Sequence, residues 1–344
     1  MPLGSPWPTI DPFLFCVHHN DSYPAANGDL GPAGSLANRE IGSDFGGLDG
    51  WRMYHGDTVP GFPRHPHRGF ETVTFVRRGL IDHADSLGAS ARYGEGDVQW
   101  LTAGGGVVHS EMFPLLDETG PNPAELFQIW VNFASADKLA EPYFTMLWAE
   151  DIPHHTEVDA MRKQIDITVI AGTLAGLTPP PPPPSSWAAR SDSDLAMWHI
   201  VFDPGATWTM PSSRHPDTVR TVYLFEGDGA SFDGELLDAA TGAVVVSDHD
   251  VSVTSATTGD RIQLLVLQAR PIGEPVAQYG PFVMNDRAGI EQAFADYQRT
   301  GFGGWPWPAD GPAHGHDPGR FARRPDGTIE RPGPTVVDRS IEYS

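Results

Sequence analysis

A run of six prolines, residues 179–184, constrains this chain more than any other feature of its sequence. Proline has no backbone N–H to donate, and consecutive prolines adopt an extended helix without internal hydrogen bonds, so the run cannot lie inside a sheet. It divides the 344 residues into two parts that are each large enough for a domain. We expect an N-terminal domain at 1–178, a linker at 179–186, a C-terminal domain at 187–285, and a helix with an irregular tail at 286–344.

Short runs of apolar and β-branched residues, each ending at turn residues, occur on both sides of the linker. The chain contains 38 glycines and 33 prolines, an excess that favours many short elements joined by tight turns. The expected strands are residues 71–76, 97–102, 126–133 and 165–171 before the linker, and 196–202, 218–225, 243–246 and 261–268 after it. The fold class is therefore all-β, with one helix at 286–299 that Asn285 or Asp286 would cap.

The charge of the chain restricts its partners. Lys and Arg number 22 against 45 Asp and Glu, which gives a net charge of −23. A surface this acidic repels nucleic-acid phosphates and anionic lipids, so we expect no direct nucleic-acid contact and no membrane association. The N-terminus lacks the basic start and apolar core of a signal peptide, and the single cysteine, Cys16, excludes an intramolecular disulfide. We expect a cytoplasmic monomer in which Cys16 is a small buried residue.

Two short motifs combine to predict a metal site. The first contains His65 and His67, and the second contains His109 and Glu111. Residues i and i+2 of a strand point to the same face, so each pair projects together. If the two strands are neighbours in a barrel, all four side chains converge. Three imidazoles and one carboxylate suit a divalent ion such as Fe, Ni, Cu, Zn or Mn, and they leave coordination positions for water, substrate or O₂.

Other residues near these motifs have simpler interpretations. An isolated His-x-His pair is usually a surface or loop feature, and the second motif is what favours a metal. Glu71 could be a fifth ligand, but we favour a structural role. The glycines at 104–106 lack the residues of a phosphate-binding loop and predict a tight turn. We interpret the remaining paired histidines as solvated loop residues: His18 and His19, His154 and His155, and His314 and His316.

The chain resembles the pirin family of the cupin superfamily. The resemblance rests on the segments 65–74 (HPHRGFETVT), 96–104 (GDVQWLTAG), 107–112 (VVHSEM) and 127–132 (FQIWVN), with later support from 271–276 (PIGEPV), 280–285 (GPFVMN) and 301–306 (GFGGWP). It extends to about residue 306. The longer section around residues 18–48, the proline linker and the tail after residue 306 depart from the family pattern, which bears on partner surfaces more than on the metal site.

The resemblance implies a bicupin, two β-barrels that face each other, with one metal in the N-terminal barrel. The family's four ligands carry over to His65, His67, His109 and Glu111. The usual metal is Fe(II), and the second barrel, which lacks matching motifs, is expected to bind none.

Two functions follow from the resemblance. Some members resemble quercetin 2,3-dioxygenases, which open a flavonol ring with O₂ and release carbon monoxide. In that case the ligand Glu111 would also be catalytic, accepting the proton of the substrate's 3-hydroxyl as general base. The alternative is a metal- or redox-sensing regulator without turnover, which would bind a protein partner. An open, substrate-sized cavity beside the metal would favour the enzyme, and a flat exposed patch would favour the regulator.

Overall fold

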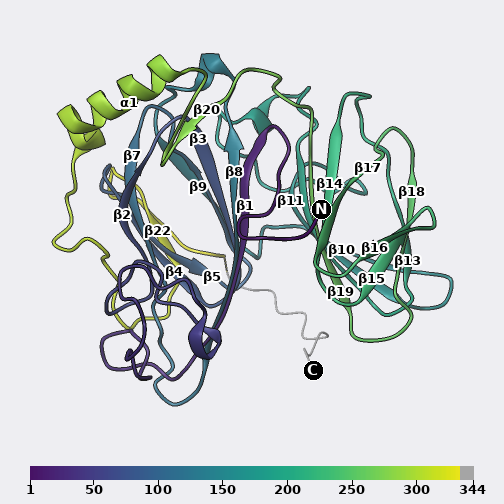
Figure 1. Cartoon of the computed structure of the whole chain (residues 1–344), viewed down its shortest axis with the longest axis horizontal. Coiled ribbons are helices and arrows are strands. Elements are labelled where there is room, and N and C mark those ends of the chain that lie inside the picture. The colour runs from purple at the N-terminus through teal and green to yellow at the C-terminus, as the bar shows by residue number, and fades with distance from the viewer. Residues whose placement is uncertain (334–344) are drawn as a thin grey trace.

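The computed structural model describes residues 1–333 and contains two β-barrels that lie side by side (Figure 1). The all-β prediction is confirmed, and every predicted strand is present within a few residues of its expected bounds. Residues 334–344, the end of the predicted irregular tail, lie outside the described part of the chain. No helix in residues 1–333 has the length and apolar character needed to cross a membrane.

The N-terminal barrel is formed by two sheets. The first has the order β1 (Phe13–Tyr23), β8 (Asn122–Asn132), β3 (Phe70–Arg78), β6 (Val98–Thr102) and β9 (Tyr143–Leu147). The second has the order β2 (Gly61–His67), β7 (Val107–Met112), β4 (Leu80–Asp85), β5 (Ser90–Gly94), β22 (Phe321–Arg323) and β23 (Ile329–Glu330). The last two strands come from the C-terminal tail, which therefore pairs with a sheet formed mainly by the first half of the chain.

The C-terminal barrel also has two sheets. The larger has the order β10 (His154–Val158), β11 (Gln164–Ala171), β12 (Ala196–Phe202), β19 (Ile262–Ala269), β14 (Val219–Glu226) and β17 (Thr241–Val245). The smaller has the order β13 (Thr207–Met210), β18 (Val251–Ser255), β15 (Gly229–Phe232) and β16 (Glu235–Asp238). Strands β10 and β11 precede the proline run, yet β11 pairs with β12 beyond it. The linker therefore connects two strands of one sheet, while the predicted domain bounds stay a prediction.

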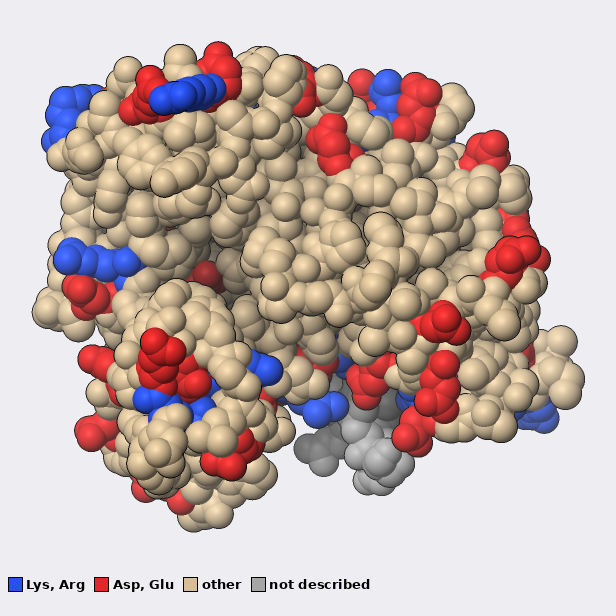
Figure 2. All heavy atoms as spheres, in the orientation of Figure 1, with Lys and Arg blue, Asp and Glu red and all other residues tan. Residues whose placement is uncertain are grey.

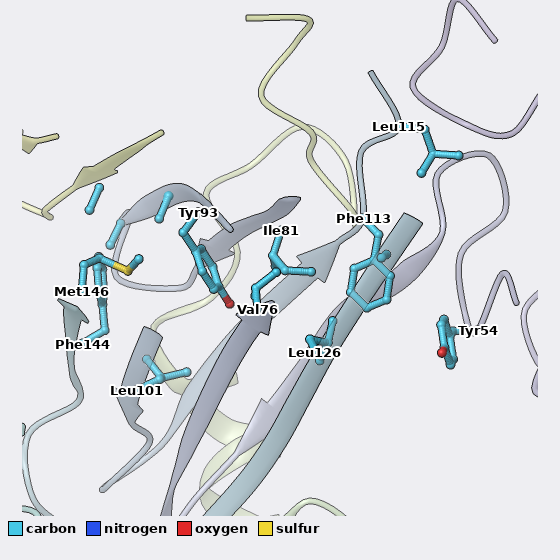
Figure 3. Close-up of a cluster of buried hydrophobic side chains, with 14 of the residues drawn as sticks. Tyr54, Val76, Ile81, Tyr93, Leu101, Phe113, Leu115, Leu126, Phe144 and Met146 are labelled. Atoms are coloured by element: carbon cyan, nitrogen blue, oxygen red, sulfur yellow. The ribbon is translucent and has the colours of Figure 1, made fainter. Parts of the chain in front are cut away.

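Apolar side chains fill each barrel and the interface between them. Figure 3 shows the interior of the N-terminal barrel, where Tyr93, Leu101, Phe113 and Phe144 belong to one buried cluster. A separate cluster joins the outer face of the first sheet to the large C-terminal sheet and includes the buried Cys16. Period-2 alternation alone could not predict this arrangement, because strands that are buried on both faces lose the alternation.

One helix and several short elements complete the fold. Helix α1 (Arg287–Thr300) begins after Asp286, whose side chain accepts a hydrogen bond from the Gly289 N–H at 2.7 Å, so the predicted helix and one of its two predicted caps are confirmed. It packs over the hairpin of β20 (Ala277–Tyr279) and β21 (Phe282–Met284). The 3₁₀ turns are η1 (Leu48–Gly50), η2 (Ser135–Asp137), η3 (Trp187–Ala189) and η4 (Gly301–Gly303).

Candidate metal centre

The two histidine motifs lie on neighbouring strands, as the sequence predicted. β2 pairs with β7 in antiparallel register, and His65 lies directly opposite His109. The close approach of the strands depends on Gly61, which has φ +128°. A Cβ at that position would lie 2.4 Å from the carbonyl oxygen of Glu111, so only glycine allows β2 to pack against β7 here.

Three histidine rings form a compact cluster. The ring centroids of His65 and His109 are 4.5 Å apart, those of His65 and His67 are 4.8 Å apart, and those of His67 and His109 are 4.9 Å apart. Each ring offers one nitrogen such that the three nitrogens lie within 4.8 Å of one another. His67 and His109 are buried, and His65 is half-buried. The convergence predicted for these three side chains is present.

The hydrogen bonds of these rings fit a metal ion. Nδ1 of His65 donates to the carbonyl oxygen of Pro63 at 2.9 Å, which leaves Nε2 free to bind a metal. Among residues 1–333, neither ring nitrogen of His109 nor Nδ1 of His67 has a hydrogen-bond partner. Buried polar atoms are normally paired, so rings with unpaired nitrogens at this position fit a metal-binding role. Burial lowers the pKa of His67 and His109 well below the ordinary value, and neutral imidazole is the form that binds metals.

Glu111 lies at the edge of this cluster. Its Oε2 is 3.8 Å from Nε2 of His109. Thr74 donates a hydrogen bond to Oε1 at 3.1 Å, and Gln128 donates one to Oε2 at 3.1 Å. The two hydrogen bonds fix the carboxylate beside the histidines, and its role as a fourth ligand stays a prediction.

A cavity of about 880 Å³ opens beside the cluster. His65, His67 and Glu111 form part of its lining, and aromatic side chains that include Phe15, Phe62 and Trp130 form much of the rest. The space-filling view is hollowed in its left half, between the positions that β1 and β2 occupy in Figure 1 (Figure 2). The volume is within the range of small-molecule sites.

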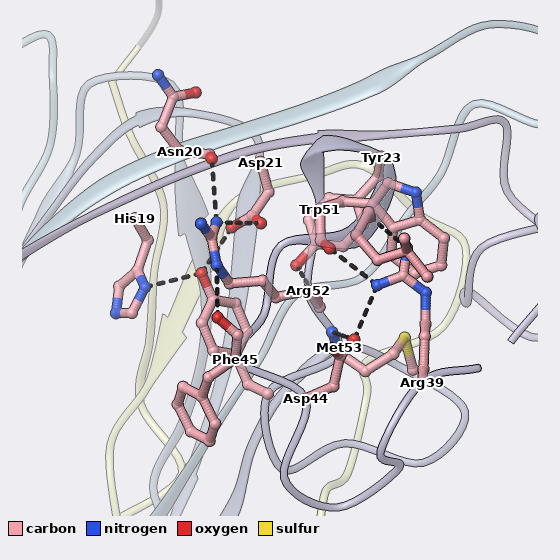
Figure 4. A network of polar contacts seen from close by, with 12 residues as sticks. His19, Asn20, Asp21, Tyr23, Arg39, Asp44, Phe45, Trp51, Arg52 and Met53 are labelled. Atoms are coloured by element: carbon pink, nitrogen blue, oxygen red, sulfur yellow. Dashed lines mark hydrogen bonds and ion pairs between the residues drawn. The ribbon is translucent and has the colours of Figure 1, made fainter. Parts of the chain in front are cut away.

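The long segment between β1 and β2 forms one wall of this cavity through a polar network (Figure 4). Tyr54 donates its hydroxyl proton to Oδ2 of Asp21 at 2.6 Å, and Arg52 donates to Oδ1 of the same carboxylate at 3.0 Å. The ring nitrogen Nδ1 of His19 lies 2.8 Å from the Tyr54 hydroxyl. The network therefore joins the segment between β1 and β2 to strand β1.

The interpretation of three histidine pairs as solvated loop residues was wrong for several of them. His18 and His19 lie in β1 and line the cavity, while His154 and His155 lie in β10. His314 is half-buried, with Nε2 2.9 Å from the backbone oxygen of His83. These assignments failed because the polar neighbours of each pair masked a strand, or a tail segment that packs back on the barrel.

Sequence reasoning also missed His83, which is fully buried in β4. Its ring centroid is 5.5 Å from that of His109, and its Nε2 lies 3.2 Å from Oδ2 of Asp85. His83 lies opposite Glu111 in the pairing of β4 with β7. Its only local signal was Asp85 two residues later, the same spacing as His109 and Glu111. The contact with His109 could not be predicted, because it depends on the order of strands in the sheet.

Glu71 and the glycine turn have the structural roles that the sequence predicted. The buried Glu71 carboxyl accepts hydrogen bonds from Thr102 at 2.9 Å and from Ser186 at 2.5 Å. It thereby holds the end of the proline linker against β3 and β6. Gly104 has φ +46°, and a Cβ there would lie 2.0 Å from the carbonyl oxygen of Ala140. The turn that leads into β7 therefore requires glycine.

Comparisons with known proteins find members of the same family over both barrels. The profile of the pirin family matches residues 33–131, and that of the pirin C-terminal cupin domain matches residues 197–303. A pirin-like protein of Solanum lycopersicum is 35% identical over 78% of this chain and 88% of its own length. Pirin-1 of Arabidopsis thaliana is 38% identical over 70% of this chain and 77% of its own. The crystal structure of a quercetin 2,3-dioxygenase from Acinetobacter baumannii superimposes with a TM-score of 0.66 at 27% identity, covering 85% of this chain and 86% of that one.

Proposed function

Because this chain belongs to the pirin family, we propose that it is a metal-dependent dioxygenase that opens the ring of a flavonol-like aromatic with O₂. The support comes from the histidine cluster, the cavity beside it and the likeness to the Acinetobacter enzyme. The proposed metal ligands are His65, His67, His109 and Glu111.

The proposed metal is Fe(II). The nitrogen and oxygen donors of the cluster suit a divalent first-row ion and include no thiolate of the kind that structural zinc sites favour. Bound iron would supply Lewis acidity and electrons for the chemistry of O₂. His65 is already oriented for this role, because its hydrogen bond to the Pro63 carbonyl directs Nε2 away from the backbone.

Glu111 is the proposed general base. Its carboxylate lies on the cavity wall and is held by hydrogen bonds from Thr74 and Gln128. A flavonol that enters the cavity with its 3-hydroxyl toward the histidines would bring that O–H group to the carboxylate. Transfer of the proton to Glu111 leaves an electron-rich aromatic ring, which is the form that is easier to oxidise.

The observation that carries the proposal is the cavity itself. At about 880 Å³ it accommodates a molecule of flavonol size directly beside His65, His67 and Glu111. A regulator that is read by a protein partner would need a flat exposed patch near the histidines instead. Aromatic side chains form much of the cavity lining, which suits a planar aromatic ligand.

The proposal is tested by measuring the products. Protein loaded with Fe(II) and supplied with quercetin and O₂ should release carbon monoxide in proportion to the quercetin consumed. The Glu111→Gln variant should bind flavonol but react at least about 100-fold more slowly, which is the usual size of a general-base contribution. Quercetin loss without carbon monoxide, or equal rates for the variant and the wild type, would contradict the proposal.

A further inference from the structure

The wall of the cavity formed by β1 and the segment before β2 carries hydrogen-bonding groups that the proposed reaction does not use. His19 lies on this wall, and its ring packs edge-on against Tyr54 with centroids 4.8 Å apart. Nδ1 of His19 lies 2.8 Å from the Tyr54 hydroxyl. Figure 4 shows His19 with one ring nitrogen in a hydrogen bond and the other directed away from that bond. The second nitrogen, Nε2, has no hydrogen-bond partner among the described residues 1–333.

The network fixes which nitrogen of His19 carries the proton. The Tyr54 hydroxyl has a single proton, and it is donated to Asp21 at 2.6 Å. The Tyr54 oxygen must therefore accept from Nδ1–H of His19. Burial and the neighbouring His18 and Arg52 lower the pKa of His19 to about 3, so its ring is neutral near pH 7. A neutral ring with a proton on Nδ1 presents Nε2 as a hydrogen-bond acceptor.

His55 offers a second group of the same kind on this wall. Its Nδ1 lies 2.7 Å from the backbone oxygen of Gly42. A carbonyl oxygen only accepts, so Nδ1 must be the donor, and in the neutral ring Nε2 is again an acceptor. The rings of His19 and His55 both pack against the ring of Phe62, with distances between ring centroids of 5.8 Å and 5.7 Å. Phe62 in turn lies 6.4 Å from the ring of His65.

We propose that His19 and His55 form a recognition subsite for phenolic hydroxyl groups at the end of the substrate remote from the metal ligands. A planar aromatic placed along Phe62 would reach the histidine cluster at one end and this subsite at the other. The acceptor nitrogens select hydroxyl groups, which donate, over ether or carbonyl groups, which only accept. The inference rests on the proposed function and narrows its substrate class to polyhydroxylated aromatics.

The test compares two ligands and does not depend on turnover. Quercetin carries phenolic hydroxyls beyond its 3-hydroxyl, and 3-hydroxyflavone carries none. Their binding to Fe(II)-loaded protein under anaerobic conditions is followed by quenching of tryptophan fluorescence, since Trp130 lines the cavity. In His19→Phe, affinity for quercetin should fall about five-fold, the effect of one net hydrogen bond, and affinity for 3-hydroxyflavone should change less than about two-fold.

Two further variants keep the test decisive. Tyr54→Phe retains the ring but removes the oxygen that orients His19. It should therefore also lower the affinity for quercetin. His249→Phe removes a histidine that is 57% exposed in the other half of the chain, and it should bind both flavonols like the wild type. If His19→Phe folds poorly, as judged by circular dichroism, Tyr54→Phe decides the question.

Each outcome separates the subsite from the proposed function. A loss confined to quercetin supports the subsite. An equal loss for both ligands, or no loss for quercetin in either cavity variant, overturns the subsite while leaving the dioxygenase proposal intact. If the wild type binds neither flavonol, the flavonol proposal fails, and the subsite inference fails with it.

Discussion

His65 of β2 and His109 of β7 lie directly opposite each other in one antiparallel pair, with ring centroids 4.5 Å apart. Their approach places a half-buried imidazole against a fully buried one. Because the buried ring of His109 has no hydrogen-bond partner in residues 1–333, the pair is costly to the fold unless a ligand occupies it. The effect of His109 on the stability of the metal-free protein can therefore be measured separately from its role in metal binding.

Replacing His109 with Leu should abolish metal binding without unfolding the protein. Leu fills a similar volume and removes two buried nitrogens that lack partners, so the free energy of unfolding of metal-free protein should change by less than about 1 kcal/mol. Metal content measured after dialysis should fall to background. Chemical denaturation of both metal-free proteins supplies the stability comparison. A loss of several kcal/mol in the metal-free variant would mean that the ring is structural.

Glu71 should make stability depend on pH. Burial raises the pKa of this carboxyl from 4.5 to about 7, opposed by hydrogen bonds from Ser186 and Thr102. Because the pKa of Glu71 is raised in the folded state, the contribution of its protonated carboxyl to the stability of the fold is complete below pH 4.5. That contribution is lost as the pH rises through about 7. Glu71→Gln cannot titrate at this position. Its free energy of unfolding should therefore rise by up to about 3 kcal/mol relative to that of the wild type as the pH goes from 4.5 to about 8.

Chemical denaturation of the wild type and Glu71→Gln at both pH values checks this prediction. Titration of other groups cancels in the difference between the two proteins. A difference that is independent of pH would show that folding does not raise the pKa of the Glu71 carboxyl.

The tail strand β22 should be required for stability. Ala322 is fully buried, belongs to the interior cluster of the N-terminal barrel and lies opposite Ala91 of β5. Ala322→Asp would bury an unpaired charge and should cost on the order of 3 kcal/mol. Arg323→Asp alters the exposed neighbour in the same strand and should cost less than about 1 kcal/mol. Thermal unfolding of both variants makes the comparison, and equal losses would contradict a packed tail.

Local patterns predicted the strands and much of the candidate site, because both depend on residues close in the sequence. The i, i+2 spacing of His65 and His67 placed both side chains in one cluster. What the sequence did not reveal depends on strand order: β11 pairs across the proline run, and β22 pairs with β5. The same reason hides His83, whose contact with His109 crosses from β4 to β7. His19 was missed because its contact with Tyr54 comes from the irregular segment between β1 and β2.

Oxygen uptake tests the central claim most directly. Purified protein is reconstituted anaerobically with Fe(II), mixed with quercetin and then given O₂, beside a His65→Ala/His109→Ala variant treated identically. The dioxygenase proposal predicts uptake in the wild type that requires both iron and quercetin and that is absent in the variant. Wild-type protein that holds iron but consumes no oxygen with quercetin or 3-hydroxyflavone would contradict it, as would equal uptake by the variant.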